Sequence, residues 1–343
     1  MELTSILAQF LPQPEQYQTV PVSNGHINHT YIISSEEGKR YILQKINTAV
    51  FTQPQNIAHN HQEVNRILEQ SGYQKSLLKP HLSLAGNYLD ETEQSWRMLE
   101  FIEGSNTHLK VPDPETAYNA AVALSEFYAA INRDNIAEIK DPLPGFINFE
   151  KRIADYRIAL DNAAEEYKTN AAEEIKFVNE NLELPKVWID LAKEGKLPQR
   201  IIHADPKISN LLFDDQNQVL AVIDLDTIMY GTLLYDFGDM IRSYTNTTEE
   251  DDGKTAHNFS AEIYQQVQKG FNTHLQDVLT DEELSLMDYA AKVVIYIQAV
   301  RFLTDYLNGS VYYSVKYADH NLDRTRNQIT LLKGLTDYLA TTS

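Results

Sequence analysis

The sequence predicts an α+β protein with a small β-rich N-terminal lobe, residues 1–103, and a larger, mainly helical C-terminal lobe, residues 104–343. Short runs rich in Tyr and Ile, separated by turn residues, dominate the first hundred positions. Long stretches with helical apolar periodicity follow them. A chain of 343 residues with 43% hydrophobic content has ample material for both lobes.

The N-terminal lobe is expected to contain three strands and one helix. Glu36-Glu37-Gly38 forms a turn-like break between the first two strands. Pro54 begins the helix and Gly72 ends it, as glycine commonly does at a helix C-terminus. His59 and His61 on this helix do not share a face, so they cannot bind one metal together and are expected to be solvated or capping. The strands are expected at 27–34, 40–46 and 95–102.

The C-terminal lobe is expected to contain long helices around one β-hairpin. Helical patterns cover 116–131, 149–167 and 284–307, and the last of these is apolar almost throughout. The hairpin pairs 211–213 with 219–223 across a polar turn. Whether the charged segment 149–197 forms a lid over a substrate is left open.

Composition excludes several classes of function. A net charge of −20 argues against a broad nucleic-acid surface, which needs clustered Lys and Arg. The absence of cysteine excludes thiol catalysis, disulfides and cysteine zinc sites. Without a signal-like start or an apolar run of roughly 18 residues, we expect a cytoplasmic protein with no membrane partner.

The strongest motif is His203-Ala-Asp205-Pro-Lys-Ile-Ser-Asn210, followed by the predicted hairpin and Asp224. Asp205 and Asn210 have the D-x-x-x-x-N spacing of a phosphoryl-transfer loop, in which a carboxylate orients the acceptor hydroxyl. Asp224 ends the second hairpin strand, where it can reach the same metal ion as Asn210. Each residue alone has an ordinary explanation as a turn or strand-end residue, but the combination favours chemistry.

These residues resemble the aminoglycoside phosphotransferase family, and within it the N-acetylhexosamine 1-kinase branch. The resemblance implies a protein-kinase-like two-lobed fold, ATP and Mg²⁺ as cofactors, and a small-molecule hydroxyl as acceptor. It covers nearly the whole chain. The matching stretches are Asn24-Gly-His-Ile-Asn28, Tyr41-Ile-Leu-Gln-Lys45, His203–Asn210, Val222-Ile-Asp224-Leu-Asp226-Thr227, Tyr235-Asp236-Phe-Gly-Asp239, Arg301–Gly309 and Asn321-Leu-Asp323-Arg324.

The resemblance implies that Asp205 is the catalytic base and that Asn210 and Asp224 hold the metal. Lys45, on the second predicted strand, stands where the family keeps the lysine that contacts the ATP phosphates. Glu63 on the following helix is the expected ion-pair partner of Lys45. Glu69 on the same helix is the alternative.

Two further segments are expected to hold the nucleotide. Gly25 allows backbone amides to approach phosphates closely, although one glycine replaces the three of a protein-kinase loop. The adenine is expected at Glu100, Phe101 and Ile102, where an apolar strand enters the link between the lobes.

Five other charged residues are weighed between structural and functional roles. Arg301 and Asp305 continue the buried face of the last apolar helix, so they form either a structural ion pair or part of the acceptor pocket. Asp226 is expected to support the metal site or contact the metal. Asp236 and Asp239 are expected to brace the helix that follows.

Other functions are weighed against this hypothesis. Only 11 residues separate Asp224 from Asp236, which leaves little room for the peptide-binding segment of a protein kinase. Aminoglycoside, homoserine and choline kinases remain alternatives on a similar fold. A sulfatase would need a C/S-x-P-x-R motif, which is missing. A non-catalytic nucleotide-binding scaffold would be expected to lack Lys45, Asp205, Asn210 or Asp224, and all four are present.

Overall fold

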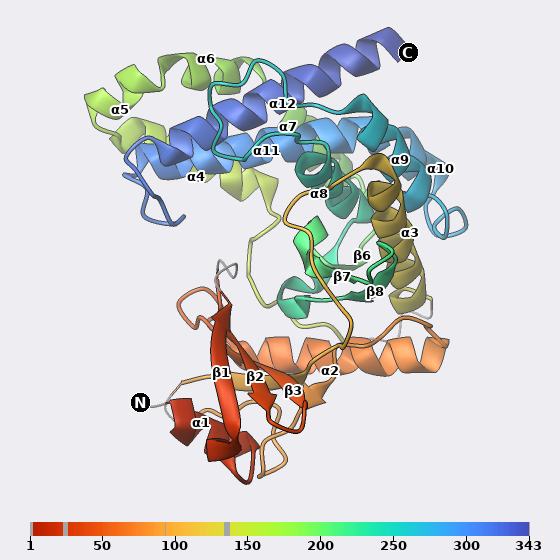
Figure 1. Ribbon diagram of the computed structural model, residues 1–343. Helices are drawn as coiled ribbons and strands as arrows, with labels where there is room; N and C mark the ends of the chain where they lie inside the picture. Colours follow the sequence, from red (N-terminus) through yellow and green to blue (C-terminus); the bar gives the residue numbers. More distant parts are fainter. Residues whose placement is uncertain (1–2, 23–26, 93, 134–137, 343) are drawn as a thin grey trace. The chain divides into compact units, whose positions relative to one another are not determined.

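A computed structural model describes residues 3–22, 27–92, 94–133 and 138–342 (Figure 1). The chain folds into two compact units, each made of several segments. The first crossing between the units lies at 107–108, close to the predicted lobe boundary. Two later segments return to the first unit, so the units do not correspond to two continuous pieces of sequence. Unit 1 contains 1–107, 130–144 and 210–230, and unit 2 contains 108–129, 145–209 and 231–343.

An antiparallel five-stranded sheet forms the centre of unit 1, in the order β1-β2-β3-β5-β4. The predicted strands are confirmed, and β1 and β4 are additional strands at the two edges of the sheet. Residues alternate between the two faces of each strand. On β5, Trp96 and Met98 therefore share one face, and Arg97 and Leu99 share the other. The strands are β1 (Tyr17–Val22), β2 (His29–Ser35), β3 (Arg40–Lys45), β4 (Pro80–His81) and β5 (Trp96–Glu100).

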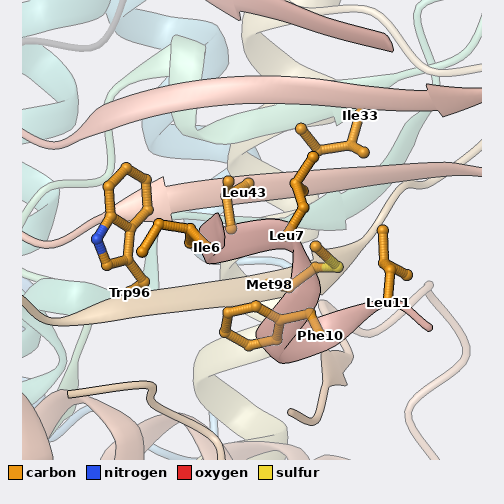
Figure 2. Close-up of a cluster of buried hydrophobic side chains, with 8 residues drawn as sticks. All are labelled: Ile6, Leu7, Phe10, Leu11, Ile33, Leu43, Trp96 and Met98. Carbon is orange, nitrogen blue, oxygen red and sulfur yellow. The ribbon is translucent and has the colours of Figure 1, made fainter. Parts of the chain in front are cut away.

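One sheet face is covered by the first helix, α1 (Leu3–Phe10). Figure 2 shows the buried cluster between them, in which aliphatic and aromatic side chains of α1 contact alternate residues of the strands. This dry layer fixes the twist and register of the strands that carry Lys45 and Arg97. The cluster consists of Ile6, Leu7, Phe10, Leu11, Ile33, Leu43, Trp96 and Met98.

The helix α2 (Pro54–Ser71) confirms the predicted element, with Gly72 at φ 73° closing it. His61 corrects the expectation of a solvated histidine, because it is buried between the Tyr88 hydroxyl and the Leu78 carbonyl oxygen, 2.5 Å from its Nε2. Burial lowers the pKa of His61 to about 4, so the ring is neutral. His59 Nε2 lies 2.7 Å from the carbonyl oxygen of Glu138.

The predicted hairpin is confirmed as β7 (Leu211–Phe213) and β8 (Val219–Val222). Leu211 pairs with Val222, and Asn217 adopts φ 56° in the turn, a conformation that Asn tolerates better than most residues. A short 3-10 helix, η3 (Leu225–Thr227), follows directly. Both belong to unit 1, together with the β-sheet.

Unit 2 is built around α11 (Met287–Leu307), which is buried along most of its length and packs against α4, α8 and α12. A helix that is apolar on nearly all sides is typical of such a central position. The predicted helix 284–307 is divided at Leu286, because its first residues belong to a separate short helix, α10, which begins with a capping box between Thr280 and Glu283. The other helices are α3 (Pro114–Ile131), α4 (Phe149–Asn162), α5 (Glu165–Asn170), α6 (Ala172–Glu180), α7 (Glu183–Lys193), α8 (Leu233–Tyr244), α9 (Ala261–Phe271), α10 (Asp281–Ser285) and α12 (His320–Thr342).

The contact between α8 and α11 depends on Gly238. A β-carbon at this position would lie 2.6 Å from Val294 Cγ2 and 2.8 Å from the Ala290 carbonyl oxygen. Glycine therefore allows α8 to approach the central helix closely. Within the described ranges, no helix has the length and apolar character needed to cross a bilayer.

Candidate active site

The hairpin of unit 1 brings the two predicted metal ligands to its open end. The Ile223 amide donates to the Asn210 carbonyl oxygen at 2.9 Å, which continues the ladder between β7 and β8 by one pair. Asp224 follows at once and adopts φ 58° and ψ 54°. This left-handed conformation costs an L-residue roughly 1–3 kcal/mol and persists only where its surroundings impose it.

A buried ion pair holds the segment after Asp224. Arg97 Nη1 lies 2.6 Å from Asp226 Oδ1, with side-chain exposures of 2% and 3%. Asn28 Nδ2 donates to the other Asp226 oxygen at 2.7 Å. Burial alone would lower the pKa of Arg97, but the Asp226 carboxylate outweighs it and raises the pKa. Asp226 is thus attached to the sheet of unit 1.

Arg97 is itself held within the sheet. Its Nε donates to Gln44 Oε1 at 2.9 Å, and Gln44 Nε2 donates to the Thr30 hydroxyl at 3.1 Å. The β5 alternation points Arg97 away from the apolar cluster of Figure 2. The hydrogen bonds run across β2, β3 and β5 and end at the loop that carries Asp224.

Lys45 ends β3 opposite Trp96, and among the residues that the structure describes its ammonium has no carboxylate partner. The expected pair with Glu63 is not formed. Glu63 instead contacts Arg66, three residues along the same helix, and this hydrogen bond lowers the pKa of Glu63. Glu69 is exposed on the same helix. The local partner is available to Glu63 at lower conformational cost than a residue on another element.

The expected adenine segment follows β5. The Glu100 amide donates to the Lys79 carbonyl oxygen at 2.8 Å, and the Phe101 amide donates to that of Arg40 at 3.4 Å. Within the described part of the chain, the Ile102 amide has no hydrogen-bond partner. Ile102 therefore presents an unused donor. Gly25 lies outside the described residues.

In unit 2, the loop that carries Asp205 is held by Asp236 from the first turn of α8. The amides of His203 and Ala204 donate to the Asp236 carboxylate at 2.7 and 3.0 Å, and the Tyr128 hydroxyl donates to it at 2.6 Å. Burial raises the pKa of Asp236 to about 7. Ala204 has φ 62°, a second left-handed residue imposed next to a predicted functional carboxylate.

Asp205 is kept ionised by nearby cations. Lys207 Nζ lies 2.7 Å from Asp205 Oδ2. Burial would raise the pKa of Asp205, but Lys207, His203 and Arg242 together lower it. Arg242 is oriented by Asp239, whose Oδ1 is 2.6 Å from its Nε. A carboxylate of this kind can accept a hydrogen bond from a hydroxyl near neutral pH.

Arg301 and Asp305 do not form the ion pair that the sequence left open. Asp305 accepts the amides of residues 311–313 at 2.8–3.0 Å and Asn321 Nδ2 at 2.8 Å. Arg301 Nη1 donates to Gln298 Oε1 at 2.9 Å. Both residues line a cavity of about 260 Å³ within unit 2. Asp305 thus holds a loop, while Arg301 faces the cavity.

The sequence from 18 to 268 matches the model of the phosphotransferase enzyme family. This match covers well over half of the chain. The chain belongs to the phosphotransferase enzyme family. Membership and the kinase fold make it an ATP-dependent phosphotransferase that acts on a hydroxyl group.

Several solved structures share the fold. An aminoglycoside phosphotransferase from Alicyclobacillus acidocaldarius superposes with a TM-score of 0.65 at 14% identity, over 99% of this chain and 97% of that one. An ethanolamine kinase from Plasmodium vivax gives 0.60 at 12% identity, over 93% and 84%. An amicoumacin kinase in complex with AMP-PNP, Ca²⁺ and amicoumacin gives 0.59 at 15% identity, over 98% and 92%. The predicted α+β two-lobed kinase fold is confirmed.

Two residues of this phosphotransferase escape notice in the sequence. Arg97 interrupts the apolar strand Trp96–Leu99, and a charge in a buried strand signals a buried partner. Lys207 lies inside the His203–Asn210 motif, two positions after Asp205, and the D-x-x-x-x-N spacing gives no signal for it.

Proposed function

We propose that this phosphotransferase moves the γ-phosphate of ATP to a hydroxyl group of a sugar, with Asp205 as the catalytic base. The observation that carries the proposal is the state of Asp205. Two amides of its loop donate to Asp236, which the Tyr128 hydroxyl also contacts, and its carboxylate is kept ionised beside Lys207. A general base must be fixed in place and unprotonated at the working pH.

Asn210 and Asp224 are proposed to hold Mg²⁺. Both supply oxygen ligands, the type that Mg²⁺ prefers, and the hairpin brings them together. Nowhere in the described ranges do three or more His, Cys, Asp or Glu residues gather as a metal cage. This fits Mg²⁺, which commonly uses one or two protein ligands together with phosphates and water. When bound, the ion supplies charge neutralisation on the transferring phosphate.

Lys45 and Ile102 are proposed to bind the nucleotide. The Lys45 ammonium lies at the end of β3 without a carboxylate partner among described residues, so it is available for phosphate oxygens. The unused Ile102 amide can donate to a ring nitrogen of adenine. Glu63 is not part of this proposal, since Arg66 occupies it.

The connecting chain limits the distance between the proposed base, Asp205, and the proposed metal ligand Asn210. Asp205 and Asn210 are five residues apart in sequence, which allows at most about 18 Å between their Cα atoms at full extension. Asp205 would accept the proton of the acceptor hydroxyl during transfer. Lys207 would hold the Asp205 carboxylate in one orientation and keep it ionised.

For the acceptor, we propose an N-acetylhexosamine phosphorylated on its anomeric hydroxyl. The support is the resemblance of the Asn24–Asn28, Ile223–Thr227 and Arg301–Gly309 stretches to the N-acetylhexosamine kinase branch. The second candidate is an amino alcohol or aminoglycoside, because several proteins with this fold are described as ethanolamine, choline or aminoglycoside kinases.

The test is ADP release over N-acetylhexosamines, their 1-O-methyl glycosides, choline, homoserine and kanamycin. We expect turnover of the free N-acetyl sugars and none of the methyl glycosides, whose anomeric oxygen has no proton to transfer. Asp205→Asn should lower this turnover by about 10²–10⁴-fold and leave nucleotide affinity largely unchanged. Rapid phosphorylation of the methyl glycosides would refute the anomeric position. Near wild-type turnover by Asp205→Asn would remove this residue from the mechanism.

A further inference from the structure

The cavity beside Arg301 lies entirely within unit 2, between α4, α11 and the loop that connects α11 to α12. Its volume of about 260 Å³ is below the usual range for drug-sized ligands and suits a group the size of one sugar ring. The polar and aromatic lining residues include Arg152, Asp155, Arg301, Asp305, Tyr312 and Tyr313.

The two arginines that line the cavity keep unused donors. Arg152 donates from Nε and Nη2 to a single acceptor, the Phe146 carbonyl oxygen, at 3.3 and 2.8 Å. Arg301 donates from Nη1 to Gln298, and its guanidinium carbon lies 5.0 Å from the ring centre of Phe146. In the part of the chain that the structure describes, neither arginine forms an ion pair with a carboxylate. A guanidinium has five N–H donors, so several remain for a ligand.

Of the two carboxylates that line the same cavity, Asp305 has its acceptor positions filled, and the charge of Asp155 is balanced by Lys151. Asp155 binds Lys151 through both oxygens, at 2.9 and 2.6 Å. Asp305 is occupied by three loop amides and by Asn321. The cavity therefore offers mainly donors, and a ligand group must bring acceptor oxygens to satisfy them.

The two guanidinium groups also repel each other. Burial lowers the pKa of Arg152, and the charge of Arg301 lowers it further. An acceptor oxygen with negative or partly negative charge would relieve this repulsion, whereas an ammonium would add to it. Ordered aromatic rings on the loop, fixed by Asp305, complete the wall.

From this arrangement we infer that the cavity binds an acyl oxygen of the acceptor, either the amide carbonyl of an N-acetylamino sugar or the carboxylate of a sugar acid. It rejects an acceptor that places an ammonium group there. The inference rests on the proposed function in taking the cavity as the acceptor subsite. The helix α8 supports that link, because it packs against α11, which carries Arg301, and its Asp236 accepts hydrogen bonds from the loop that carries Asp205.

The first test compares four sugars that share a free anomeric hydroxyl: N-acetylglucosamine, glucuronic acid, glucose and protonated glucosamine. We expect kcat/KM to be at least about tenfold higher for one or both acyl sugars than for glucose, and lowest for glucosamine. The first two sugars separate the amide from the carboxylate as the source of the oxygen. Glucosamine turnover equal to that of the acyl sugars would overturn the inference.

The second test removes the donors. Arg152→Gln and Arg301→Met should each lower kcat/KM for the preferred acyl sugar by about 10–100-fold, while glucose changes much less. Arg157→Gln is the matched control, because Arg157 is exposed on the same helix as Arg152 and does not line the cavity. Equal losses of kcat/KM for the acyl sugar and for glucose would show that the arginines do not bind the acyl group.

Calorimetric binding separates this inference from the proposed function. Asp205→Asn, titrated with N-acetylglucosamine and with glucuronic acid, should bind at least one of them, and Arg301→Met in that background should abolish the heat. If binding is seen but no sugar is phosphorylated, the sugar kinase proposal fails and the subsite stands. If sugars are phosphorylated without discrimination, or neither acyl sugar binds, the subsite is refuted.

Discussion

Arg97→Met should destabilise the protein far more than the loss of an ordinary surface ion pair. The substitution keeps an unbranched apolar side chain in the strand but leaves the Asp226 carboxylate buried, with Asn28 as its remaining hydrogen-bond donor among the residues that the structure describes. Removing one member of a buried pair typically costs about 3–5 kcal/mol, since the other charge stays desolvated. At 2% and 3% side-chain exposure and 2.6 Å separation, this pair belongs to that class.

Urea unfolding followed by circular dichroism measures the effect. Arg66→Met is the matched control, because it breaks an arginine–carboxylate pair whose side chains are 41% and 20% exposed. Such pairs contribute about 0.3–0.5 kcal/mol within a helix. The double variant Arg97→Met with Asp226→Asn should recover part of the loss, because no buried charge then remains unpaired.

A functional consequence accompanies the stability change. Asp224 adopts a left-handed backbone directly before the segment that Arg97 holds, so loosening that segment should let Asp224 relax toward ordinary conformations. We therefore expect Arg97→Met to raise the Mg²⁺ concentration needed for half-maximal ADP formation. Equal unfolding free energies for Arg97→Met and Arg66→Met, or an unchanged Mg²⁺ requirement, would refute the reasoning.

Three further outcomes are expected. Asp224→Ala should raise the Mg²⁺ requirement sharply, and coinciding Mg²⁺ titrations of variant and wild type would exclude Asp224 as a ligand. Gly238→Ala should lower the unfolding free energy by about 1–3 kcal/mol, because its β-carbon would lie 2.6 Å from Val294 Cγ2; an unchanged urea midpoint would contradict the tight α8–α11 contact. Asp236 has a pKa raised from 3.8 to about 7, so its protonated form favours folding below pH 4 and this contribution is lost as the pH rises through 7. The Tm of wild type minus that of Asp236→Asn should therefore decrease between pH 4 and pH 7, and a flat difference would argue against the raised pKa.

The elements with strong local signals were predictable from the sequence. Alternation and turn residues predicted β2, β3, β5 and the hairpin, and Gly72 marked the end of α2 at a left-handed position. The split between α10 and α11 at Leu286 was missed, because apolar periodicity continues across the break and Leu286 is not a typical helix-end residue. The Leu286 amide donates to carbonyl oxygens of α10, which ends that short helix.

The candidate site residues likewise differ in the strength of their local sequence signals. Asp205, Asn210 and Asp224 belong to compact motifs, so their spacing in the sequence is enough to nominate them as candidate site residues. Glu63 was misassigned because helix register cannot tell which of two cations a carboxylate will choose, and Arg66 on the same helix is the nearer choice.

Charged residues on a buried helix face present the harder problem, as Arg301 and Asp305 illustrate. Their spacing of four on α11 suggests a pair, but Asp305 is satisfied by amides of a loop whose path no local pattern predicts. Once the loop takes that carboxylate, Arg301 is left facing the cavity with donors to spare. The acceptor specificity that we infer therefore depends on the hydrogen bonds between Asp305 and the loop, because they leave Arg301 without a carboxylate partner on its own helix. It follows that Asp305→Asn, which weakens the hold on residues 311–313, should raise KM for the acceptor more than it lowers kcat, and a change confined to kcat would argue that the loop does not shape this cavity.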